Sequence, residues 1–119
     1  MLLGIADSEE QMADMFDVAQ RLAEAVGQDA TFGIESLVTG LGRQSKLMLD
    51  NLGIIVDTEQ AYKNYADELG VSVNSLDDAE KKQAFVNEAM QKGKDLVKGL
   101  GKENETEMFY MLLLHQVVL

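Results

Sequence analysis

Apolar residues recur at intervals of three and four along most of the chain, beginning near its start. In the first segment they are Met12, Met15, Phe16, Ala19, Leu22, Ala23 and Val26. This spacing places them on one face of an amphipathic helix. Asp7 or Ser8 can cap that helix, and Gly27 stands where a helix end favours a left-handed residue. The pattern predicts a helix over residues 8–26.

The same pattern predicts four further helices, over residues 31–41, 45–52, 58–69 and 77–98. Two of them begin at a capping box, in which an N-cap side chain and a side chain three residues later each bond the other's backbone. Asp57 and Gln60 form one box, and Asp77 and Glu80 form the other. Boundaries set by such residues are expected to hold within about 2–4 residues.

Glycines and one apolar triplet are expected to separate these helices. Gly40 and Gly42 are interpreted as ending the second helix, Gly53 the third and Gly70 the fourth. Residues 54–56 are β-branched and would suit a strand by propensity. Because no partner strand is evident, we predict an extended, buried connector instead.

The end of the chain changes in composition. Glycines between residues 93 and 101 are expected to weaken the last helix, and the polar residues 102–107 are interpreted as a break. We therefore divide the chain into a helical domain, residues 1–101, and an apolar C-terminal segment, residues 102–119. That segment is expected to be an interface or a docked helix.

The predicted fold class is all-α, a small irregular bundle of four to six helices with no sheet. A tight stop at Gly53 should fold the third helix back toward the next one. The residues that this would bring into one core are Leu49, Leu52, Ile54, Val56, Tyr62, Tyr65, Leu69, Phe85 and Val86.

The formal net charge of −11 narrows the possible partners. A surface this acidic repels nucleic-acid phosphates and anionic lipid. The apolar start of the chain lacks a basic region and is followed by acids, so no signal peptide is predicted. Residues 108–119 are strongly apolar, but a membrane-spanning helix needs about 20 such residues. We expect neither nucleic-acid binding nor a membrane span.

No group of residues has the pattern of a catalytic or metal site, so no enzyme activity, cofactor or metal is predicted. The one histidine, His115, lies in an apolar run without an evident catalytic partner. Acid pairs such as Asp77–Asp78 sit at predicted helix starts, where they stabilise the helix dipole. Residues 103–107 alternate acids without the glycine turn of a calcium loop, and residues 40–45 lack the ending of a phosphate loop.

One stretch resembles a known family. Residues 47–56, LMLDNLGIIV, are followed by YKNYA at 62–66 and by LDDAEKKQAF at 76–85. In order and spacing these elements resemble an internal region of phage and prophage tail tape-measure proteins, and the resemblance covers about residues 15–98. The family-motif positions are Leu49, Asp50, Asn51, Leu52, Gly53, Ile54, Tyr62 and Tyr65.

The resemblance implies a structural, non-enzymatic role in tail assembly and length determination. It implies tail-tube or tail chaperone proteins as partners, and the virion tail, or the host cytoplasm during assembly, as the location. Residues 101–119 lie outside the resemblance. The alternative that we carry forward is a small acidic helical adaptor or regulatory binding module that grips a partner helix.

Self-association is predicted through the C-terminal run. The residues expected to form the contact are Met108, Phe109, Met111, Leu112, Leu113, Val117 and Val118, together with Leu114 and Leu119. A contiguous apolar surface of this kind usually marks an interface. A two-fold dimer is the commonest way to cover it. The competing possibility is that the run folds back as a final helix within one chain.

Overall fold

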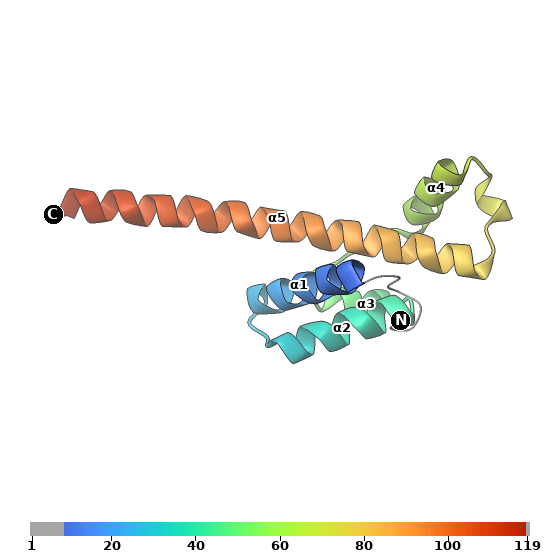
Figure 1. The fold of residues 1–119 in the computed structure, drawn as a ribbon, viewed down its shortest axis with the longest axis horizontal. Coiled ribbons are helices and arrows are strands. Elements are labelled where there is room, and N and C mark those ends of the chain that lie inside the picture. Colours follow the sequence, from blue (N-terminus) through green and yellow to red (C-terminus); the bar gives the residue numbers. More distant parts are fainter. Residues whose placement is uncertain (1–8, 119) are drawn as a thin grey trace.

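The computed structural model describes the backbone of residues 9–118 and the side chains of residues 9–100. Its elements are α1 (Glu9–Ala25), α2 (Ala30–Gly42), α3 (Lys46–Asp50), α4 (Thr58–Leu69), a 3-10 turn (Val73–Ser75) and α5 (Asp78–Val118). The described part of the chain contains no strand. The predicted all-α bundle is confirmed, with α1, α2 and α3 on one side of α5 and α4 near its start (Figure 1).

Short polar side chains begin the helices, as the capping patterns predict. The side chain of Asp57 accepts a hydrogen bond from the backbone N–H of Gln60 at the start of α4. At the start of α5 the bonds are reciprocal. The Glu80 N–H donates to Asp77 Oδ1 at 2.8 Å, and the Asp77 N–H donates to Glu80 Oε1 at 3.0 Å. The predicted box at Asp77 and Glu80 is therefore confirmed in full. At Asp57 only the N-cap bond forms, because the side chain of Gln60 donates to Asn64 Oδ1 instead.

The box at the start of α5 should contribute measurably to stability. Asp77→Ala removes the acceptor for the Glu80 N–H, and loss of such a cap costs about 1 kcal/mol. The matched control is Asp78→Ala, which removes a neighbouring acid in the first turn but not the cap. Urea unfolding followed by circular dichroism should show the larger loss for Asp77→Ala. Equal losses would mean that only the charge near the helix dipole matters.

The core forms where α1, α2, α3 and the connector after α3 meet one face of α5. Its largest fully buried side chains are Phe85, Met15, Leu37, Leu41, Leu49, Leu52 and Ile54. The connector alternates, as an extended segment does: Leu52, Ile54 and Val56 are buried, whereas Ile55 is 73% exposed. The prediction of a buried connector over residues 54–56 is right for Ile54 and Val56 and wrong for Ile55.

Part of the predicted core is wrong. Leu69 is 47% exposed, and Tyr62 and Tyr65 are only half-buried. The reason is that α4 packs mainly against α5, with its fully buried positions limited to Ala61 and Ala66. Helix α3 packs against α2 rather than folding back toward α4.

The interpretation of Gly40 as a helix stop is also wrong. Gly40 lies inside α2, is buried, and has the side chain of Leu49 where its own Cβ would be. Gly33 and Gly93 also have close neighbours where a Cβ would be. Gly33 lies against the backbone of Ala19. Gly93 lies against the side chains of Val18 and Ile54. These three glycines allow close approach between elements. By contrast, Gly27, Gly53 and Gly70 have positive φ angles and end helices as predicted.

The expected break at residues 102–107 is wrong as well. Helix α5 continues through these residues and runs from Asp78 to Val118, a length of 41 residues. Lysine and glutamate are good helix formers, so a polar stretch rich in them extends a helix although it offers no apolar face. At about 1.5 Å per residue α5 is about 60 Å long, and its second half extends away from the other helices (Figure 1). The longest dimension of the molecule is 65 Å.

Candidate functional site

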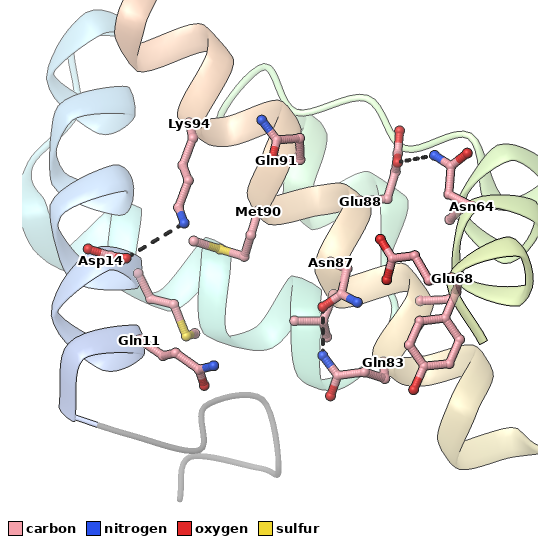
Figure 2. A pocket seen from close by; sticks show the side chains of 15 residues that line it. Gln11, Asp14, Asn64, Glu68, Gln83, Asn87, Glu88, Met90, Gln91 and Lys94 are labelled. Carbon is pink, nitrogen blue, oxygen red and sulfur yellow. Dashed lines mark hydrogen bonds and ion pairs between the residues drawn. The ribbon is translucent and has the colours of Figure 1, made fainter.

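A groove of about 370 Å³ lies between α1 and α4, along one side of α5 (Figure 2). Helices α1 and α4 each pack against α5, and the groove occupies the space between them. Its apolar lining comes from Met15, Ala61, Ala84, Val86 and Met90. Its polar lining is contributed by Gln11, Asp14, Asn64, Tyr65, Glu68, Gln83, Asn87, Glu88, Gln91 and Lys94.

Amide side chains on α5 form the most regular part of this lining. Gln83, Asn87 and Gln91 follow one another at four-residue intervals, so they lie along one side of the helix. Gln83 Nε2 donates to Asn87 Oδ1 at 2.7 Å, and Gln91 Nε2 donates to Asp95 Oδ1 at 3.0 Å. Each amide retains further donor or acceptor capacity. This side of α5 can therefore offer hydrogen bonds of both kinds to a polar partner.

Charged groups cross the groove at two places (Figure 2). Lys94 Nζ of α5 lies 3.6 Å from Asp14 Oδ2 of α1, and both side chains are about half exposed. Near α4, Asn64 Nδ2 donates to Glu88 Oε2 at a long 3.5 Å. Lys92 also approaches Glu88, at 3.9 Å. The Lys94–Asp14 pair is exposed and contributes little to stability, so it does not close the groove firmly. The side chain of Glu88 is only 12% exposed, and its pair with Lys92 lies within α5.

The lining of the groove combines amides, carboxylates, one lysine and an apolar floor. In the part of the chain whose side chains are described, His, Cys, Asp and Glu form no cluster of three or more that could hold a metal. The four-residue amide spacing on α5 was the sequence signal for this surface, and it was missed.

The family-motif residues do not assemble into a binding site. Leu49, Leu52 and Ile54 lie in the core, whereas Asp50, Asn51 and Gly53 are exposed around the turn between α3 and the connector. Tyr65 lines the groove from α4. Tyr62 lies apart, with Lys81 Nζ 5.9 Å from its ring centre. The motif therefore builds a turn and its packing.

The predicted self-association residues from Met108 to Val118 belong to the second half of α5, and Leu119 lies outside the described residues. The backbone of Met108 through Val118 is helical, but the side chains of this run, including His115, lie outside the described residues. The proposed caps Asp7 and Ser8 also lie outside them. Within residues 9–118, no helix is long and apolar enough to cross a membrane.

The chain matches no protein-family model and no solved structure.

We expect no measurable affinity for nucleic acid. The net charge of −11 opposes contact with phosphates, and neutralising phosphates is what supplies most non-specific binding. Fluorescence anisotropy with labelled duplex DNA at low salt tests this most stringently, because screening is weakest there. Tight binding that weakens steeply as salt rises would show the charge argument to be wrong.

Proposed function

We propose that this chain is a structural, non-enzymatic segment of a phage or prophage tail protein, acting in tail assembly and length determination. The proposal rests on the resemblance over residues 15–98 to tail tape-measure proteins. The observation that supports it best in the fold is α5, a single helix of 41 residues. A protein that sets a length needs an element whose span grows with residue number, and a helix converts each residue into about 1.5 Å.

Two surfaces are available to partners in this proposal. One is the second half of α5, which extends beyond the other helices (Figure 1). The other is the groove between α1 and α4, with its row of amides on α5. Tail-tube subunits or tail chaperone proteins are the partners that we propose. The location would be the virion tail, or the host cytoplasm during assembly.

The test first asks whether a tail-tube protein is encoded beside this chain, and then mixes that purified protein with the full chain. We expect co-sedimentation and, by negative-stain electron microscopy, more or longer tubes than the tube protein forms alone. Asn104→Pro should remove this effect, because proline in a helix interior breaks the helix. Asn104→Ala, which keeps the helix, should preserve it. Absence of tail genes around the coding sequence, or tube assembly indifferent to the chain, would contradict the proposal.

The groove favours a second candidate function, that of a small acidic helical adaptor or regulatory binding module. In that case the partner contact depends on the groove and not on the end of α5. Asn87→Arg places a large cation among the amides and should block binding, whereas Asn104→Pro should leave it unchanged. The opposite pattern favours the tail-protein role. Gln20→Arg, on an exposed position of α1 outside the groove, is the control for the added charge.

A further inference from the structure

Helix α5 carries one continuous row of positions along its whole second half. Starting at Met90, the row advances by alternating steps of three and four residues, the spacing of a helix–helix contact. Its members are Met90, Gly93, Val97, Leu100, Asn104, Glu107, Met111, Leu114 and Val118. We call this set the α5 row.

The first part of the α5 row already makes such a contact. Met90, Val97 and Leu100 pack against the core, and Gly93 approaches Val18 and Ile54 closely. From Asn104 onward the same row continues on a helix that extends away from the other helices (Figure 1). The α5 row therefore packs within the chain as far as Leu100. Beyond Leu100, none of the other helices described in residues 9–118 lies beside it (Figure 1).

The distribution of charge along the chain indicates which kind of surface can pack against the α5 row from Asn104 to Val118. Every charged residue of the chain lies before Met108, so the formal charge of −11 belongs to residues 1–107 and none of it to the tip, residues 108–118. A partner attracted by charge would contact residues 1–107, which we call the acidic region. The tip suits a surface that is itself apolar and uncharged, and the tip of a second copy has these properties. Two identical surfaces can pair by a two-fold rotation.

The same distribution of charge indicates whether two α5 helices pair parallel or antiparallel. In a parallel pair, Glu107 of one copy would stand level with Glu107 of the other, and the two acidic regions would lie side by side. Like charges at the same level of a helix pair oppose association. In an antiparallel pair the tips overlap and the acidic regions lie at opposite ends. We propose that two copies of this chain associate antiparallel through the tips of α5, along the α5 row.

This inference rests on the structural role proposed for α5, because it names the partner of the projecting helix. Light scattering on the full chain over a range of concentrations should show a mass that rises from 13.1 kDa toward twice that value. Leu114→Gln alters the α5 row in both copies and should raise the dimer dissociation constant about 100-fold. The control is Leu113→Gln. The sequence pattern alone assigned Leu113 to the contact, but the α5 row excludes it, so this identical change one residue away should have a much smaller effect.

The direction of pairing can be measured with spin labels, because the chain has no natural cysteine. Labels at Gln116→Cys should lie within about 20 Å of each other, since the tips overlap. Labels at Lys98→Cys should lie about 40 Å apart in an antiparallel pair, but within about 20 Å in a parallel one. Short distances at both positions would overturn the antiparallel arrangement.

Two other results would overturn the inference. One is a full chain that stays monomeric at every concentration. The other is equal weakening by Leu113→Gln and Leu114→Gln, which would mean unspecific apolar adhesion. Circular dichroism of each variant checks that the fold is intact. A monomeric chain that still acts on tail tubes would refute self-association and leave the proposed function standing, so the two failures are distinguishable.

Discussion

Leu52→Ala is expected to lower the free energy of unfolding by about 2–5 kcal/mol, the range found when a buried leucine is truncated. Leu52 is 2% exposed and belongs to the core cluster that joins α1, α2, α3 and α5. Removing its side chain leaves a cavity among residues from several elements. Because it lies on an irregular connector next to a tight turn at Gly53, the cavity should collapse only partly.

The matched control for Leu52→Ala is Ile55→Ala, three residues along the same connector. Ile55 is 73% exposed, so its truncation should change stability by no more than about 0.5 kcal/mol. Chemical denaturation of both variants and the parent, followed by circular dichroism, gives the comparison. If Leu52→Ala unfolded at the same denaturant concentration as the parent protein, the placement of the connector beneath α5 would be wrong.

Gly33→Ala should destabilise the protein although alanine is the better helix former. A Cβ at Gly33 would overlap the carbonyl oxygen of Ala19 and stand 2.8 Å from the Cβ of Ala23. The nearest group is backbone, so α1 and α2 would have to move apart. Overpacking of this kind typically costs about 1–3 kcal/mol.

The same substitution at Gly99 should have the opposite sign. Gly99 lies within α5, and its added Cβ would meet nothing within 4 Å. Without a clash, the gain in helix propensity remains, up to about 1 kcal/mol. In thermal melts, the melting temperature of Gly33→Ala should therefore lie below that of the parent protein, and that of Gly99→Ala above it. A stabilising effect at Gly33 would mean that α1 and α2 do not approach as closely as described.

Features of the fold that depend on neighbouring residues could be predicted from the sequence. The N-cap bond at Asp57, the capping box at Asp77 and the turn at Gly53 need only groups within a few residues. For the same reason the first four helices begin and end close to the predicted positions. The alternation along residues 52–56 likewise follows from the local pattern of an extended segment.

Features that depend on distant residues could not be predicted. Leu69 lies on an apolar stripe, but only the arrangement of α4 against α5 shows that its position is uncovered. Gly33 and Gly40 resemble helix breakers until the helices that approach them are known. The groove, too, requires the placement of α1 and α4 on α5, although the amide spacing was visible. Residues 102–107 were misjudged because a polar composition does not by itself end a helix.

Helix α5 continues as one helix beyond the other elements (Figure 1), and the distance between two of its residues measures this extension. Spin labels at Lys92→Cys and Gln116→Cys in the same chain, diluted with unlabelled protein to suppress distances between copies, should lie about 36 Å apart, with a narrow distribution. These positions flank the polar residues 102–107. A separation well below about 25 Å would instead mean that the end of α5 folds back onto the bundle and does not project from it.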